Sequence, residues 1–272
     1  MPTFNRDSAT IHYTDTGPPA DRPDAPTVFF GHGLLFSGWM FRSQIATLRD
    51  EYRCVAIDWR GQGDSAATRA GYDMDTLAAD AVGLMEALGV APVHYVGLSM
   101  GGFIGQRIAA RRPDLVRTLT LLDTSAGPED PDKAGRYKML GRIYRLTGIP
   151  PLRKAVVPLM FGPSFLSDAS HTEILDEWQA CLSRSRRAGV SRAVFGVADR
   201  ASIEDEISSI TAPTLVVVGA DDRATPPHKS ERIAERIPGA RLEVIPECGH
   251  SSTLEQPDTV TALLRGFLER NA

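Results

Sequence analysis

A serine on a short turn flanked by glycines is the strongest chemical signal in this sequence of 272 residues. Residues 97–101 read Gly-Leu-Ser-Met-Gly; they follow an apolar run at 93–96 and precede a helix-like run at 102–112. In the order strand, turn and helix, the turn projects the serine hydroxyl, and small neighbours let the backbone close. The N-terminus of the helix favours negative charge as it develops. We therefore predict that Ser99 is a nucleophile.

A serine hydroxyl is a weak nucleophile until a base removes its proton, and we predict that His250 is this base. His250 follows the predicted strand 241–245, and a loop at the carboxyl end of that strand can reach the same rim as Ser99. We interpret His32 as a hydrogen-bonded scaffold residue and His94 as a packed residue inside a strand. The remaining histidines are His12, His171 and His228.

A carboxylate should hold the histidine in the right tautomer and stabilise its protonated form. Asp221 and Asp222 both follow the apolar run 214–218, and either gives the chain order Ser, Asp, His that goes with this kind of serine turn. We predict Asp222 as the acid. Asp221 and Asp123, which follows the run 118–122, are the alternatives. The acids without this role would serve as caps or turn residues.

Backbone amides near the serine should complete the chemistry. Residues 31–35 read Gly-His-Gly-Leu-Leu and follow the predicted strand that ends at Phe30, so this turn can present an N–H group toward Ser99. We predict that the amides of Leu34 and Met100 form an oxyanion hole, which stabilises the negative oxygen of a tetrahedral intermediate. The side chain of Leu34 is then expected in the wall of the substrate pocket.

The elements that must position these groups alternate between short apolar runs and helix-like segments. This alternation predicts an α/β fold, with a mostly parallel sheet covered by helices on both faces. A further run, 10–16, alternates in polarity and is expected to be a more exposed edge strand. The predicted strands are 27–30, 53–57, 93–96, 118–122, 214–218 and 241–245. One predicted helix begins near Asp75, and the other three are 102–112, 229–236 and 258–268.

The alternation stops between residues 127 and 211, which contain scattered prolines and many large apolar residues. So many apolar side chains do not suit a solvated loop, and we predict a helical cap packed over the sheet. The expected domains are a core of 1–126 and 212–272 and a cap of 127–211. The cap should give a mostly apolar substrate cleft, unless an arginine between Arg184 and Arg192 turns inward to hold a carboxylate.

Composition argues against several other classes of function. The net charge is −4, without the clustered positive charge that nucleic-acid binding needs. Three widely spaced cysteines suit reduced thiols, and the sequence has no metal motif, so neither metal nor cofactor is expected. The N-terminus lacks the pattern of a secretory signal, and no apolar run is long enough to cross a bilayer. We therefore expect a cytoplasmic protein with no membrane partner.

Five motifs in combination resemble the α/β-hydrolase superfamily. They are HG at 32–33, D-x-R-G-x-G-x-S at 58–65, GLSMGG at 97–102, GADD-x-x-TP at 219–226 and CGH at 248–250. The resemblance covers nearly the whole chain outside the cap. It implies that Ser99 is the nucleophile, Asp222 the acid and His250 the base, that Leu34 and Met100 are oxyanion donors, and that 127–211 is a cap domain.

Within the superfamily, the chain is most similar to 3-oxoadipate enol-lactonases and related lactonases and esterases. The similar segments are GLSMGGFIGQ at 97–106, LLDTS at 121–125 and RRAGV at 186–190. This resemblance implies a serine hydrolase that cleaves a small-molecule carboxylic ester or lactone through an acyl-enzyme. Carbon–carbon bond hydrolysis in a ring-cleavage pathway, cofactor-free perhydrolysis or haloperoxidation, and non-catalytic ligand binding are the alternatives. The oligomeric state stays open.

Overall fold

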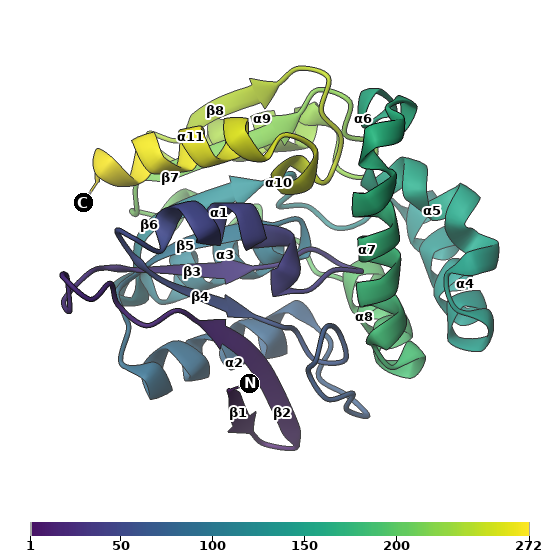
Figure 1. Cartoon of the computed structure of the whole chain (residues 1–272), viewed down its shortest axis with the longest axis horizontal. Coiled ribbons are helices and arrows are strands. Elements are labelled where there is room, and N and C mark those ends of the chain that lie inside the picture. Colours follow the sequence, from purple (N-terminus) through teal and green to yellow (C-terminus); the bar gives the residue numbers. More distant parts are fainter. Residues whose placement is uncertain (1, 272) are drawn as a thin grey trace.

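The computed structural model of the chain describes residues 2–271. Its centre is an eight-stranded sheet in the order β1-β2-β4-β3-β5-β6-β7-β8 (Figure 1). Every neighbouring pair from β4 to β8 is parallel, whereas β1 and β2 are antiparallel to their neighbours. The strands are β1 (Thr3–Arg6), β2 (Ala9–Asp15), β3 (Thr27–Gly31), β4 (Arg53–Ile57), β5 (Val93–Leu98), β6 (Val116–Leu122), β7 (Thr214–Gly219) and β8 (Arg241–Ile245).

Helices cover both faces of the sheet, which explains why the central strands are apolar at almost every position. Successive residues of a strand point to opposite faces, so Phe30 packs with Leu48 on one side and Phe29 packs with Ile104 on the other. One face carries α1 (Arg42–Leu48) and α11 (Pro257–Glu269); the other carries α2 (Met74–Leu88), α3 (Met100–Arg111) and α9 (Pro227–Arg236) (Figure 1).

The predicted α/β class is confirmed, and so are the central strands and the four helices, within about two residues at each end. The prediction for 10–16 was wrong in one respect, because β2 is not the edge strand. Residues Thr3–Arg6 form the edge and pair antiparallel with β2. Four mostly polar, half-exposed residues carry too little alternation to show as a strand in the sequence. The short helix α1 was also missed.

Between β6 and β7 the chain forms only helices, and we call residues 127–211 the helical segment. Figure 1 shows these helices beyond the carboxyl ends of the parallel strands. Helix α4 packs chiefly on α8, and the indole N–H of Trp178 in α7 donates to the carbonyl of Leu35, 3.1 Å away. The main helices of the segment are α4 (Pro131–Thr147), α5 (Arg153–Met160), α6 (Pro163–Ser167), α7 (Thr172–Arg184) and α8 (Arg187–Ala198).

Candidate active site

Ser99 sits between β5 and α3 in a conformation that side-chain-bearing residues rarely adopt, with φ 51° and ψ −110°. Two hydrogen bonds to the neighbouring strand end hold it there. The Ser99 amide donates to the carbonyl of Leu122 at 2.9 Å, and the hydroxyl of Thr124 donates to the carbonyl of Ser99 at 2.8 Å. Backbone strain of this kind persists only where surrounding contacts enforce it, and it clusters at functional sites.

His250 and Asp222 are joined by a buried hydrogen bond of 2.8 Å between Nδ1 of the imidazole and Oδ2 of the carboxylate. The other oxygen of Asp222 accepts the amides of Ala224 and Thr225, at 2.8 and 2.9 Å. The hydroxyl of Thr225 also donates to Oδ2, at 2.8 Å. A carboxylate on Nδ1 favours the tautomer in which the opposite nitrogen, Nε2, can accept a proton.

The charges around His250 favour its protonated form. Burial alone would lower the pKa of His250, because it disfavours the imidazolium. The charge and hydrogen bond of Asp222, with further contributions from the carboxylates of Asp123 and Glu255, outweigh burial and hold the pKa above the usual 6.5. A base with a raised pKa binds the serine proton more strongly.

The alternative acids are not paired with His250. Asp123, at the end of β6, accepts the amide of Gly219 at 2.9 Å and the hydroxyl of Ser252 at 2.5 Å. Burial, together with the charge of Asp222, raises the pKa of Asp123 to about 8. Asp221 is only partly buried. Of the three acids weighed from the sequence, the one that the structure pairs with His250 is Asp222.

The geometry around Leu34 leaves its amide as the available donor in that turn. The amide of Gly33 donates to the sulfur of Met40 at 3.4 Å, and the amide of Leu35 donates to Oε1 of Gln62 at 2.9 Å. Met100 is the first residue of α3, and the first amides of a helix have no partner within the helix. These positions suit two oxyanion donors.

Ser99, His250 and Leu34 all line one cavity of about 90 Å³ between the sheet and the helical segment. The cavity wall is mostly apolar. Among the described residues that line it, the one carboxylic acid is Glu129, which pairs with Arg200 at 2.9 Å. Met100 is buried and lies outside this lining. The helical segment contributes Tyr137, Leu140, Gly141, Tyr144, Ile149, Leu152, Val156, Leu159, Met160, Val194 and Val197.

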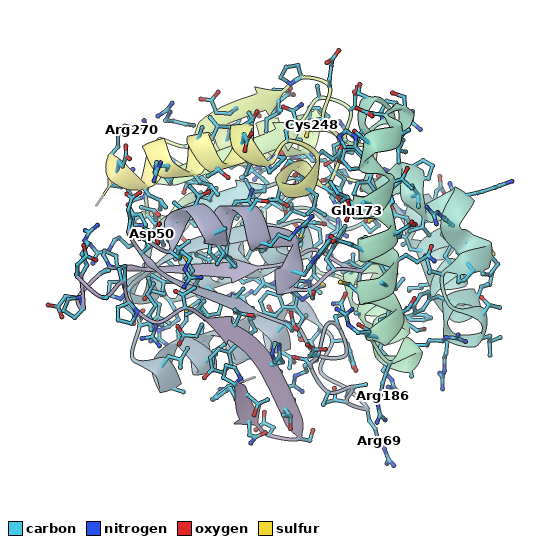
Figure 2. The ribbon with its side chains drawn as sticks, viewed as in Figure 1. Asp50, Arg69, Glu173, Arg186, Cys248 and Arg270 are labelled. Carbon is cyan, nitrogen blue, oxygen red and sulfur yellow. The ribbon has the colours of Figure 1, made fainter. Side chains whose placement is uncertain are left out.

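The arginines that could have reached inward have contacts elsewhere. Arg187 donates to the carbonyl of Leu146 at 2.9 Å, and Arg192 donates to the carbonyl of Thr68 at 2.8 Å. Arg186 points away from the body of the molecule at one end of the helical segment (Figure 2). No arginine of residues 184–192 is among the described residues that line the cavity. The prediction of a mostly apolar cleft therefore fits the structure better than that of an inward-turned arginine.

Comparison with known proteins agrees with the fold. A model of the alpha/beta hydrolase fold family matches residues 26–257. The chain belongs to this family. It is 26% identical to 3-oxoadipate enol-lactonase 2 of Acinetobacter baylyi, over 99% of each chain. It is 31% identical to RutD of Caulobacter sp. (strain K31), named as a candidate carbamate hydrolase, over 96% of each.

Solved structures agree as well. A thermophilic esterase from Thermogutta terrifontis superposes on this alpha/beta hydrolase with a TM-score of 0.88 and 29% identity, over 97% of this chain and 94% of that one. The resemblance and the fold class predicted from the sequence are confirmed. Within residues 2–271, no helix has the length and apolar character needed to cross a membrane.

The other histidines of this alpha/beta hydrolase lie outside the cavity lining that the structure describes. His32 is a scaffold residue as predicted: one ring nitrogen lies 2.7 Å from the carbonyl of Gly33 and the other accepts the amide of Trp59 at 3.0 Å. His94 is fully buried, with Nδ1 2.9 Å from the hydroxyl of Thr118. His12 pairs with Asp58 at 3.0 Å.

Sequence reasoning missed several polar residues at the site. Thr225 was seen only as part of a motif, although a threonine three residues after an aspartate is a common local hydrogen-bonding pattern. Gln62 and Glu129 gave no local signal, because their partners are distant in the sequence. Glu255 had a weak signal as an acidic residue in the first turn of α10 (Ser252–Glu255), directly after the His250 loop.

Proposed function

We propose that this alpha/beta hydrolase is a serine hydrolase that cleaves a small neutral carboxylic ester or lactone through an acyl-enzyme. The observation that carries the proposal is the meeting of Ser99 and His250 in one apolar cavity, with His250 hydrogen-bonded to the buried carboxylate of Asp222. The similarity to an enol-lactonase and an esterase supports it.

In the proposed mechanism, Nε2 of His250 takes the hydroxyl proton while Oγ of Ser99 attacks the substrate carbonyl carbon. The carbonyl oxygen becomes an oxyanion, which the amides of Leu34 and Met100 stabilise. When the tetrahedral intermediate collapses, the bond to the leaving oxygen breaks, and the imidazolium protonates that oxygen. His250 then deprotonates a water molecule that attacks the acyl-enzyme. A second collapse releases the acid and returns the proton to Ser99.

We also propose that the helical segment is a cap domain, 127–211, over a core of 1–126 and 212–272. Most of the apolar residues that line the cavity with Ser99 belong to this segment. The cavity volume of about 90 Å³ favours short acyl groups over long ones. Carbamates, carbon–carbon substrates and peracid formation would use the same groups, and a substrate panel separates them from simple esters.

The deciding experiment is hydrolysis of p-nitrophenyl acetate with intact-mass detection of the acyl-enzyme. We expect turnover in the wild type and a covalent acetyl adduct that maps to Ser99. The Ser99→Ala variant should keep its fold and lose about 10⁶-fold in rate, as is typical when a triad nucleophile is removed. Ser208, an exposed serine outside the cavity lining, makes a serine-to-alanine control. Activity above a few per cent in pure Ser99→Ala protein would contradict the proposal.

A further inference from the structure

The carboxylate of Glu255 accepts hydrogen bonds from three backbone amides. Oε2 accepts the amide of Gly249 at 2.8 Å, and Oε1 accepts the amide of Ser251 at 3.0 Å. These two amides belong to the residues on either side of His250. The third donor is the amide of Gly162, which lies in the helical segment, 2.9 Å from Oε2. One buried side chain thus joins the histidine loop to the helical segment.

Two further contacts tighten the same junction. The hydroxyl of Ser251 donates to the carbonyl of Met160 at 2.6 Å, and Met160 lines the cavity. Gly162 and Gly249 approach so closely that a Cβ atom on Gly249 would collide with the backbone of Gly162. The end of α5 and the loop of His250 are therefore held as one unit.

The charge of Glu255 also acts on the imidazole. Three carboxylates from three elements influence His250: Asp222 after β7, Asp123 at the end of β6, and Glu255 in α10. Each favours the imidazolium when it is ionised, which for Asp123 requires a pH above about 8. Glu255 differs from the other two because it is bonded to the amides on both sides of the histidine, so it acts on the position of the ring as well as on its charge.

We propose that Glu255 is a positioning residue that fixes His250 against Ser99 and fastens the end of α5 to the histidine loop. The inference rests on the proposed function for its effect on rate. The hydrogen bonds from the three amides to Glu255, which we call the clamp, can be tested without measuring activity. The proposal predicts that loss of the Glu255 carboxylate displaces both His250 and the cavity wall at Met160.

The test is Glu255→Gln, with Glu247→Gln as the matched control. Glu247 lies in the same loop but is exposed. A glutamine at 255 has one acceptor oxygen, and its NH₂ group would face an amide donor whichever way it turns. We expect kcat for p-nitrophenyl acetate to fall about 10- to 100-fold, as for other small displacements of catalytic groups. The pH midpoint of activity should move down, because the imidazolium loses a stabilising charge. Glu247→Gln should change neither.

Amide hydrogen exchange supplies a readout that does not depend on activity. The amides of Gly162, Gly249 and Ser251 should exchange faster in Glu255→Gln than in the wild type or Glu247→Gln. Unchanged exchange at all three amides would overturn the clamp, even if the protein proved inactive on every ester. Faster exchange with an unchanged kcat and pH midpoint would contradict the role of Glu255 in positioning His250.

If Glu255→Gln does not fold, Glu255→Asp decides the question. Aspartate keeps the negative charge, but its side chain is shorter than that of glutamate by one methylene group. We expect its pH midpoint to stay closer to the wild-type value while kcat falls, because charge is retained and geometry is lost. A wild-type kcat in Glu255→Asp, with wild-type exchange at the three amides, would overturn the proposal.

Discussion

Asp123 and Asp222 follow neighbouring strands, and their surroundings give them different tasks. Asp222 is bonded to His250 and to the amides of Ala224 and Thr225. Asp123 is buried, and burial with the nearby charge of Asp222 raises its pKa to about 8. At neutral pH Asp123 is therefore mostly protonated, and the carboxylate that is hydrogen-bonded to His250 is that of Asp222. Two carboxyl groups close together seldom ionise at once.

Asparagine substitutions should separate the two aspartates. Asp222→Asn should lower kcat/KM for p-nitrophenyl acetate by about 10⁴-fold, because the imidazole loses the carboxylate that orients it. Asp123→Asn should stay within a few-fold of the wild type at pH 7, since an amide resembles a protonated carboxyl group. It can still accept from Gly219 and donate to Ser252. A greater loss in Asp123→Asn than in Asp222→Asn would reverse the two assignments.

Asp123 should also leave a signature in the pH dependence of stability. Its pKa is near 8 in the folded chain and about 3.9 in an unfolded one. Between these values the folded state holds a proton that the unfolded state has lost, so the free energy of unfolding falls as the pH rises from about 4 to about 8. Urea unfolding at about pH 5, 7 and 9 should show Asp123→Asn gaining stability relative to the wild type as the pH rises, with the gain levelling off above 8. A constant difference would refute this.

At the scale of elements, the turn that carries Ser99 depends on how closely α3 approaches the sheet. A Cβ atom on Gly101, in the first turn of α3, would collide with the backbone of Gly31 at the end of β3. The positive φ of Ser99 follows from the same crowding, because the chain must reverse within a few residues between β5 and α3.

A glycine pair tests this requirement. Gly101→Ala should lower the free energy of unfolding by about 3 kcal/mol, since backbone must shift to admit the methyl group. Gly135→Ala is the control, because Gly135 lies in α4 with no atom within 4 Å of the added Cβ. It should gain about 1 kcal/mol from helix propensity. Urea unfolding of both variants gives the comparison, and equal stability of Gly101→Ala and the wild type would argue against the close-approach explanation.

The central elements could be predicted from the sequence because each has a local signal. Strands covered on both faces are continuously apolar, and α2 carries its own boundaries: the side chain of Asp73 accepts the amide of Thr76, and Gly89 ends the helix at φ 62°. Strand β1 and helix α1 lack such signals. The same reasoning applies to the site. Ser99 and Asp222 stand in recognisable turns, whereas Glu255 gains its partners only when the loop and the helical segment meet.

At the scale of the whole molecule, the proposed catalytic groups follow strands of the sheet, and most of the proposed substrate wall comes from the helical segment. This division predicts a preference for neutral esters, because no lysine or arginine is among the described residues that line the apolar cavity. Arg200 is already paired with Glu129. An unpaired buried charge costs several kcal/mol, so a neutral ester should exceed its carboxylate analogue by about a hundredfold in kcat/KM.

Variants of the arginine-rich stretch provide the control for that comparison. Arg187→Ala and Arg192→Ala should leave the ratio between neutral and anionic substrates unchanged, since these side chains bind carbonyl groups away from the cavity. A strong preference for the anion that disappears in either variant would show that an arginine enters the pocket during binding. That result would favour substrates with a free carboxylate.

The way in which the histidine loop meets the helical segment bears on how new specificities could be built on this scaffold. On the side of the segment, this junction uses the amide of Gly162 and the carbonyl of Met160, both main-chain groups. Any residue except proline supplies both groups, although the close approach at 162 calls for glycine. A chimera that exchanges residues 127–211 for the equivalent stretch of a relative would keep the attachment to Glu255 and Ser251 with a single glycine retained. The chimera would then keep Ser99, Asp222 and His250 and would take its pocket wall from the relative.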